Sequence, residues 1–180
     1  MFFAWRTTES VQALGPVAVN LTVASRLAAV LAGLWAGVLL CIGAIAAPSA
    51  FATLLPADAG RMAGRMFAQE AYLSLGAALL LFVIERQRSR DAATAGTGSV
   101  LSANIVLLLG TLFCTVAGYF AVQPMLDAAR AGRGNVSFAA LHAVSGGLFV
   151  LKALLVLALA WRFGAPRPPS GSIKTAATTS

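Results

Sequence analysis

The chain has 180 residues, of which 59% are hydrophobic and 11% are charged, and its mean hydropathy is +0.84. Soluble globular proteins average roughly 45–50% apolar and about 25% charged residues, so this chain has too few polar side chains to cover a surface that faces water. The net charge of +7 comes from basic residues that punctuate apolar runs, without the aromatic and basic interleaving that binds single-stranded nucleic acids. This composition argues against a soluble enzyme, a disordered chain, a disulfide scaffold and a nucleic-acid-binding protein, and it predicts an integral membrane protein.

The first long apolar run, residues 27–57, contains 31 residues without a charge. A helix needs about 20 such residues to cross the hydrocarbon. Pro48 interrupts the run, because proline lacks a backbone donor and disfavours helical geometry just before it. The sequence therefore predicts a membrane helix over 25–47, preceded by an N-terminal extension at 1–24. A cleaved signal peptide is the alternative, but the apolar run is longer than the usual 7–15 residues of a signal peptide.

The second membrane helix is less clearly marked. Only 14 uncharged residues, 71–84, lie between two glutamates, and this stretch alone is too short to span. No proline occurs from residue 57 to residue 123, so a helix can begin outside the bilayer and enter it further along. The sequence predicts a helix over 59–86, with Asp58 as its N-cap.

Two further helices are expected in the second half of the chain. Residues 100–122 are uncharged and long enough to span, and Pro124 is expected to end that helix. The fourth helix is predicted over 138–161, and its one charge is Lys152. The tail at 163–180 is rich in Pro, Ser and Thr and is predicted to be disordered, so the four-helix transmembrane domain covers 25–162.

Basic residues predict the orientation of the chain. Four spans place both termini on one side of the membrane, and basic residues are enriched on the cytoplasmic side. Eight of them fall on the terminal side, namely Arg6, Arg26, Arg86, Arg88, Arg90, Arg162, Arg167 and Lys174, and four fall on the other, namely Arg61, Arg65, Arg130 and Arg133. We therefore expect an all-α, integral membrane four-helix bundle with both termini cytoplasmic, in a bacterial cytoplasmic (inner) membrane.

Small residues predict which helix faces pack together. Membrane helices associate through small side chains that allow close backbone approach. The first helix has such a stripe at Gly33, Gly37, Cys41, Ala44 and Pro48, and the third has one at Gly110, Cys114, Ala117, Gly118 and Ala121. Both faces are expected to be buried in the bundle, and pairing of the two stripes with each other is one option. The two cysteines are interpreted as small apolar side chains without a disulfide.

Lys152 is the strongest candidate for a functional residue within the membrane. A charged group in hydrocarbon costs at least about 2.5–3.5 kcal/mol, so an intramembrane ionisable residue suggests a functional site. His142 and Ser145 share its side of the fourth helix, which makes that face polar. Glu70 is the only carboxylate near membrane depth, and it is placed close to the outer boundary. A pair between Lys152 and Glu70 would need both side chains to stretch, and a neutral buried lysine or a shifted helix register are the alternatives.

His142 is the sole histidine in the chain. Its interpretation as a hydrogen-bonded structural residue is preferred to haem or metal ligation, so no cofactor and no metal site are predicted. No serine, acid and histidine set fits a hydrolase, and no Gly-rich phosphate loop follows a strand. We expect that the protein is not an enzyme.

Two sequence patterns carry a family resemblance. The first is the turn AP..F..L.P..AG...G..F, formed by Ala47, Pro48, Phe51, Leu54, Pro56, Ala59, Gly60, Gly64 and Phe67, and the second is LH..S, formed by Leu141, His142 and Ser145. Over residues 26–161 the chain resembles the small bacterial four-helix membrane proteins of the DUF4149 or TMEM205-like family. That family often has an asparagine about one turn beyond the serine, where this chain has Phe149. The resemblance implies a multi-pass membrane protein and names no activity, cofactor or substrate.

Three functions fit these observations. The first is a non-enzymatic bundle that binds or moves a small solute or a metal species through His142, Ser145, Lys152 and Glu70, with a homo-oligomer needed for transport. The second is an accessory or structural subunit that docks another membrane protein in the lipid bilayer through small-residue faces. The third is a membrane redox subunit that binds haem through His142 across a dimer.

Overall fold

The computed structural model describes residues 16–94, 96 and 101–165, and the regular structure in these residues is helical. The first half contains α2 (Pro16–Cys41), the π-helix η1 (Ile42–Ala46), α3 (Ala47–Thr53) and α4 (Pro56–Thr94). The second half contains α5 (Ala103–Thr115), the π-helix η2 (Val116–Val122), α6 (Gln123–Arg130) and α7 (Phe138–Gly164). Since α2, η1 and α3 follow one another without a gap, as do α5, η2 and α6, each half consists of two long helical rods.

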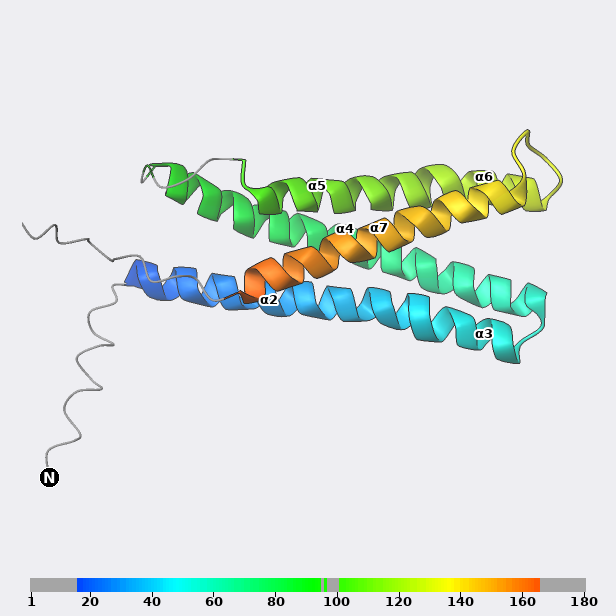
Figure 1. Cartoon of the computed structure of the whole chain (residues 1–180), viewed down its shortest axis with the longest axis horizontal. Helices are drawn as coiled ribbons and strands as arrows, with labels where there is room; N and C mark the ends of the chain where they lie inside the picture. Colours follow the sequence, from blue (N-terminus) through cyan, green and yellow to red (C-terminus); the bar gives the residue numbers. More distant parts are fainter. Residues whose placement is uncertain (1–15, 95, 97–100, 166–180) are drawn as a thin grey trace, which may run out of the picture.

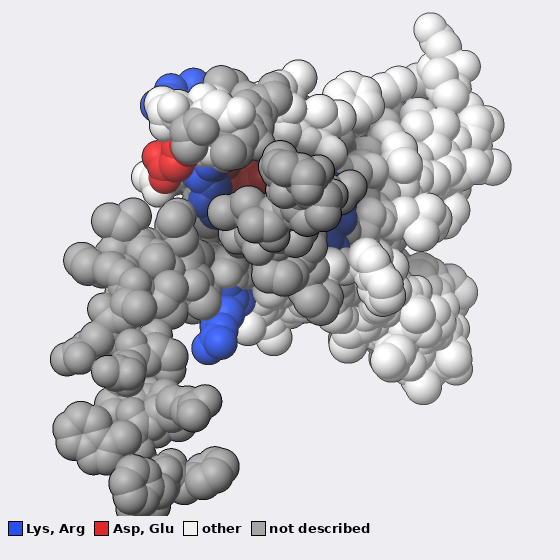
Figure 2. Space-filling view, turned by 60° about the vertical axis from the view of Figure 1, so that its left-hand side comes forward, with Lys and Arg blue, Asp and Glu red and all other residues white. Residues whose placement is uncertain are grey.

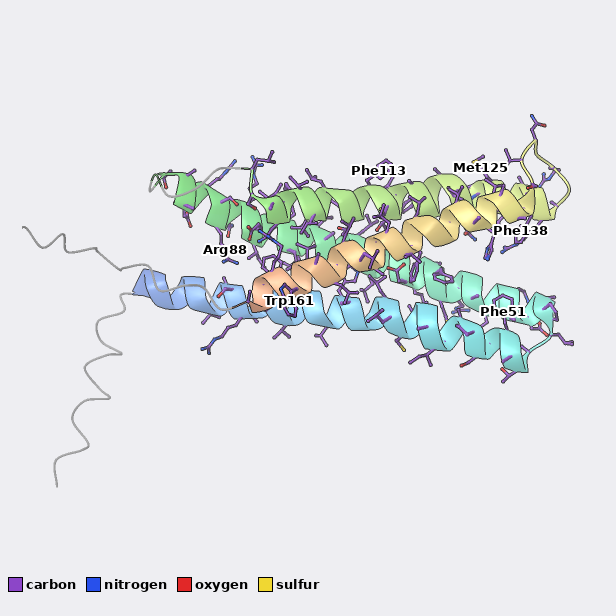
Figure 3. All side chains as sticks on the ribbon, viewed as in Figure 1. Phe51, Arg88, Phe113, Met125, Phe138 and Trp161 are labelled. Carbon is purple, nitrogen blue, oxygen red and sulfur yellow. The ribbon has the colours of Figure 1, made fainter. Side chains whose placement is uncertain are left out.

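The outer surface of these rods is apolar. Within the described residues, four helical stretches are long and apolar enough to cross a membrane, namely Val23–Thr53, Pro56–Thr94, Ala103–Arg130 and Phe138–Gly164. Exposed side chains such as Phe113 and Met125 project from the upper rod (Figure 3). In Figure 2 the flank of the helices is white, and the visible charged atoms gather at the end of the bundle where α2 begins and α7 ends. Such a surface suits lipid, and the chain is a multi-pass membrane protein.

The rods form a four-cornered bundle (Figure 1). Neighbouring corners are α2 with α4, α4 with α5, α5 with α7, and α7 with α2. The helices α4 and α7 occupy opposite corners, and in the described residues no Cα atom of one comes within 8 Å of a Cα atom of the other. Any direct contact between them is therefore made by side chains that reach across the middle of the bundle. The start of α2 and the end of α7 lie at the same end of the molecule (Figure 1), and we refer to it as the chain-end side.

The apolar core occupies the half of the bundle nearer to those chain ends. Its largest fully buried side chains include Trp35 and Leu39 of α2, Leu81 of α4, Leu108 of α5 and Leu159 of α7. A smaller cluster of Val122, Leu126 and Leu141 packs η2 and α6 against α7 at the opposite end of the bundle. The larger apolar cluster therefore lies toward one end of the bundle and the smaller one at the other.

Neither Pro48 nor Pro124 ends a helix, so the predictions that helices stop at 47 and 122 were wrong. Each proline is the second residue of the α-helix that follows a π-helix. In the first rod the N–H of Ala47 donates to the carbonyl of Ile42, five residues back, which is the wider π-helical spacing. Proline removes one N–H and its ring crowds the preceding turn, and a widened turn accommodates both effects without breaking the rod.

Other predicted boundaries also differ from the structure. The helix predicted over 59–86 runs from Pro56 to Thr94, so Asp58 is in its first turn, where it pairs with Arg61, and is not the N-cap. The third helix begins at Ala103 instead of 100, because the hydroxyl of Ser102 accepts from the N–H of Ile105 as an N-cap.

Two more predicted boundaries, at the end of the fourth helix and in the N-terminal extension, differ from the structure. The fourth helix starts at Phe138, as predicted, and continues to Gly164 instead of ending at 161. Part of the predicted extension at 1–24 belongs to the first rod, since α2 begins at Pro16. The rest of that extension, and the predicted tail from 166 onward, lie outside the described residues.

The two halves of the chain repeat one arrangement. In both, a rod with a π-helix and a proline is followed by a helix that carries one buried ionisable residue near its middle. Glu70 is the fifteenth residue of α4, and Lys152 is the fifteenth residue of α7. Phe67 and Phe149 are each the twelfth residue of the same helices. Equivalent helices of the two halves therefore occupy opposite corners, an arrangement like that of membrane proteins built from parallel repeats.

Candidate functional site

Lys152 and Glu70 form a buried ion pair across the middle of the bundle. The lysine Nζ donates to Glu70 Oε1 at 2.8 Å and to Oε2 at 2.7 Å, and the two side chains are 5% and 2% exposed. The helices are at opposite corners, so both long side chains extend toward the axis between them. The pair considered from sequence is present, and Glu70 is buried inside the bundle.

Two further side chains extend this pair toward the first rod. Ser74, one turn after Glu70 on α4, donates its hydroxyl to Glu70 Oε1. The indole Nε1 of Trp35 on α2 in turn donates to Ser74 Oγ at 2.8 Å. A chain of hydrogen bonds therefore connects three of the four corners, from α2 through α4 to α7. Sequence reasoning missed Ser74 and Trp35, although the spacing of four residues between Glu70 and Ser74 places both on one helix face.

A cavity of about 270 Å³ extends from the ion pair toward the end of the bundle opposite the chain ends. The four residues proposed from sequence, Glu70, His142, Ser145 and Lys152, all line it. Glu70 and Lys152 are buried, Ser145 is half-buried and His142 is exposed, so the set runs from the floor of the cavity to its rim. The structure therefore brings all four residues to one space.

The walls of the cavity consist largely of aromatic rings and glycines. Phe67 and Phe149 meet edge to face with ring centroids 5.2 Å apart, and the Lys152 ammonium is 5.3 Å from the centre of the Phe149 ring. A Cβ atom added to Gly43 would lie 2.7 Å from Phe149 Cε1, so only glycine leaves room for the ring there. At Gly64 an added Cβ would meet nothing within 4 Å, because it would point into the open space.

Much of the predicted turn motif forms these walls. Four of its residues, Phe51, Gly60, Gly64 and Phe67, line the cavity. Two other residues of the motif do not line the cavity: Ala59 is buried in the packing of α4, and Pro48 is exposed. The residues that carry the family resemblance are therefore largely those that shape the space next to the ion pair.

The rim carries a cation and a stack of rings. Arg130 lines the cavity, donates to the Asp127 carboxylate at 3.2 Å, and lies 5.2 Å from the centre of the Phe138 ring. That ring stacks on His142, with centroids 5.7 Å apart. His142 is thus held by an aromatic neighbour and has no direct contact with Lys152. Figure 3 shows Phe138 and Phe51 at this end of the bundle.

The small-residue stripe of the first helix faces outward, so the prediction that it is buried was wrong. All five of its members, Gly33, Gly37, Cys41, Ala44 and Pro48, are exposed. The face of α2 that packs inward carries Trp35 and Leu39 instead. The stripe of the third helix is inside over part of its length, and its partner is α7, since Gly110 and Gly118 lie against Leu155 and Leu148. Both cysteines are free thiols, Cys41 exposed and Cys114 buried at the cavity.

A second buried polar cluster lies at the opposite end of the bundle and was not predicted. Glu85 of α4 accepts hydrogen bonds from Ser102 at 2.8 Å and from Asn104 at 3.0 Å, and Arg88 lies 3.7 Å from its other oxygen. Arg162 of α7 donates to the Asn104 amide oxygen at 2.6 Å. This cluster connects α4, α5 and α7 near the chain ends, where the charged residues had been used only to predict the orientation of the chain.

The donor set of the cavity does not suit a metal ion. Among the described residues, no group of three or more His, Cys, Asp or Glu side chains is arranged to hold one. The single histidine and the single carboxylate that line the cavity are at its two ends. The chemistry of the cavity is instead that of an apolar pocket with a few polar groups, an arrangement typical of small-molecule sites.

Comparison with known proteins gives a family and no relative of known function. The searches of curated proteins and of solved structures found no match. The sequence model of the family described as "Domain of unknown function (DUF4149)" matches residues 30–135, which is more than half of the chain. The match includes Glu70, Ser74 and the turn motif, and it ends before α7, which carries His142 and Lys152. The chain belongs to the DUF4149 family.

Proposed function

We propose that this protein is a non-enzymatic membrane protein that binds a small solute in the cavity above the Glu70–Lys152 pair. One observation carries the proposal: the buried Glu70–Lys152 pair lines a cavity instead of being enclosed in solid packing. An intramembrane ion pair is expensive to bury, and in membrane proteins such groups mark solute or ion pathways. The cavity is somewhat smaller than the range of about 300–1,000 Å³ typical of drug-sized ligands, so it suits a small molecule.

The proposal concerns an organic solute and not a metal species. The described residues that line the cavity include four phenyl or phenol rings, from Phe51, Phe67, Tyr119 and Phe149. Rings of this kind contribute contact area with the apolar part of a ligand. Transport would also require an opening through the apolar core, at the end of the bundle opposite the cavity. A movement of the first pair of helical rods against the second pair would provide one, as in transporters built from parallel repeats.

We further propose that both chain ends are cytoplasmic and that the protein lies in a bacterial inner membrane, with the cavity facing outward. The support is the distribution of arginines: the chain-end side of the bundle has Arg26, Arg86, Arg88, Arg90 and Arg162, against Arg61, Arg65, Arg130 and Arg133 at the cavity end. A green fluorescent protein fused after the last residue should fluoresce in cells, and an alkaline phosphatase fused there should be inactive. The reverse pattern would contradict this orientation.

Blocking the cavity tests solute binding. The protein is purified in mild detergent and examined by native mass spectrometry for small molecules that co-purify. In Gly64→Leu the new side chain enters the cavity, whereas in the matched control Gly76→Leu it is placed on an exposed position of the same helix that does not line the cavity. We expect a co-purifying organic molecule in the wild type and in the control, and its loss in Gly64→Leu. Equal loading of all three proteins, or none in any, would contradict the proposal.

The second candidate is an accessory subunit or a homo-oligomer, and one specific observation favours it. The exposed stripe with Gly33 and Gly37 on α2 leaves a face on which another helix can approach closely. Substitution Gly37→Ile should then dissociate the assembly seen by native mass spectrometry. The control Gly147→Ile changes an exposed glycine of α7 and should leave the assembly intact. A monomeric wild-type protein, or equal dissociation by both substitutions, would argue against this candidate.

A further inference from the structure

The charges that line the cavity are unbalanced. Among its described lining residues the charged side chains are Glu70, Lys152 and Arg130, which are one acid and two bases. Asp127 pairs with Arg130 but does not line the cavity, and both members of that pair are largely exposed, so the pairing screens the guanidinium only weakly. His142 also lies at the rim, and Glu70 is the one acid among the described residues that line the cavity. The field inside the cavity therefore favours negative charge.

The ammonium of Lys152 has unused hydrogen-bonding capacity at the floor of the cavity. A lysine carries three N–H donors, and the hydrogen bonds of Lys152 in the described structure are the two to Glu70. Glu70 is more fully engaged, because it accepts from Ser74 in addition to Lys152. The centre of the Phe149 ring is 5.3 Å from the ammonium, and an aromatic ring accepts no conventional hydrogen bond. A ligand that offers an acceptor can therefore bind the third donor of Lys152 without breaking the pair.

We infer that the solute is a small organic anion, a carboxylate attached to an apolar body. This deepens the proposed function and rests on it. The carboxylate binds Lys152 at the floor of the cavity, and the apolar body lies against the touching rings of Phe67 and Phe149 in the cavity wall. Arg130 at the rim attracts the anion toward the cavity. A neutral molecule of the same shape forgoes the charge-assisted hydrogen bond, and an amine is repelled by the two cations.

A set of four probes with the same ring separates charge from shape. Benzoate, benzyl alcohol, benzylamine and phenylglycine are titrated by calorimetry into the full chain in lipid nanodiscs, with empty nanodiscs to correct for partitioning. We expect benzoate to bind about tenfold to a hundredfold more tightly than the other three, the range expected for one charge-assisted hydrogen bond. Equal binding of benzoate and benzyl alcohol, or tighter binding of benzylamine or phenylglycine, would overturn the inference.

Two substitutions identify the residue that recognises the charge. Glu70→Gln removes the competing carboxylate and keeps an oxygen that can accept from Ser74, so benzoate should bind several-fold more tightly. Lys152→Met should abolish the preference for benzoate over benzyl alcohol. The Glu70→Gln result decides the question even where Lys152→Met fails to fold, and unchanged or weaker benzoate binding in Glu70→Gln would overturn the inference.

The failure of this inference is distinguishable from the failure of the proposed function. Binding of all four probes with similar affinity, lost in Gly64→Leu and kept in Gly76→Leu, would overturn the anion inference and leave the solute cavity in place. If none of the four probes binds, the anion inference is overturned. The co-purification experiment then decides whether the cavity holds a solute of another class.

Discussion

Glu70 and Lys152 stand at equivalent positions of two opposite helices and meet across the middle of the bundle. In a symmetric pair of identical hairpins this position would carry the same residue twice, and like charges in contact would repel. Here the two halves carry opposite charges, so the contact is attractive. The two helices occupy opposite corners, so their contact is made by long side chains that reach across the bundle.

Breaking the pair from one side should be costly. In Lys152→Met, Glu70 is left as an uncompensated buried charge, which destabilises proteins by about 3–5 kcal/mol. The double substitution Lys152→Met with Glu70→Gln removes both charges and should recover most of that loss. Thermal unfolding in detergent, followed by circular dichroism, measures both variants against the wild type. A single variant as stable as the wild type would show that the pair carries no net ionic interaction.

The equivalence of the two positions predicts that the charges can be exchanged. Glu70→Lys or Lys152→Glu alone places like charges together, whereas the double exchange restores an ion pair of opposite polarity. The exchanged pair should remain weaker than the original by about 0.5–1.5 kcal/mol, because the place on α7 that corresponds to Ser74 is occupied by Val156, which cannot donate to the new carboxylate. Unfolding temperatures of the three variants test this, and a double variant no more stable than the single ones would contradict it.

Ser74 should contribute more to stability than an exposed serine does. In Ser74→Ala the Glu70 carboxylate loses a donor and the Trp35 indole is left without its acceptor, so we expect a loss of about 1–3 kcal/mol. The Trp35 environment changes too, so the fluorescence spectrum of the variant should shift. The matched control is Ser49→Ala on the exposed side of α3, which should change neither quantity appreciably. Equal effects of the two substitutions would contradict the buried hydrogen-bond chain.

The cluster at the chain-end side should act as a clamp on three helices. Asn104 bridges Glu85 and Arg162, so Asn104→Ala removes two hydrogen bonds to charged groups at once. Such bonds are worth about 1.5–3 kcal/mol each, and partial exposure of Arg162 places the expected loss toward the lower end. Urea unfolding in detergent compares this variant with Asn135→Ala, which changes an exposed asparagine. If the two variants unfold alike, the clamp makes no net contribution.

Gly43 should be the glycine of the first rod least tolerant of a side chain. In Gly43→Ala the new methyl group would overlap the Phe149 ring, which Phe67 supports from another side, and overpacking of this kind costs about 1–3 kcal/mol. Gly37→Ala adds the same group where nothing lies within 4 Å and serves as the control. Thermal unfolding should show a lower midpoint for Gly43→Ala alone. Equal midpoints would mean that the ring moves aside without cost.

Several features follow from the sequence by itself. Hydropathy and the absence of charge over long runs determined the all-helical, multi-pass architecture, because a chain in lipid must satisfy its backbone hydrogen bonds within helices. The turn motif from Ala47 to Phe67 indicated the DUF4149 family, and the comparison confirmed this family. The rarity of ionisable residues at membrane depth directed attention to Lys152 and Glu70.

Only the tertiary structure decided how these residues meet. The length of an apolar run does not determine the depth or rotation of a helix, since packing against neighbouring helices sets both. The helices therefore continue through Pro48 and Pro124 by way of π-helical turns, which hydropathy does not reveal. Packing also turned the glycine stripe of α2 outward, because Trp35 reaches Ser74 from the opposite face of that helix. The same packing brings Glu70 to the middle of the bundle, where Lys152 is its partner.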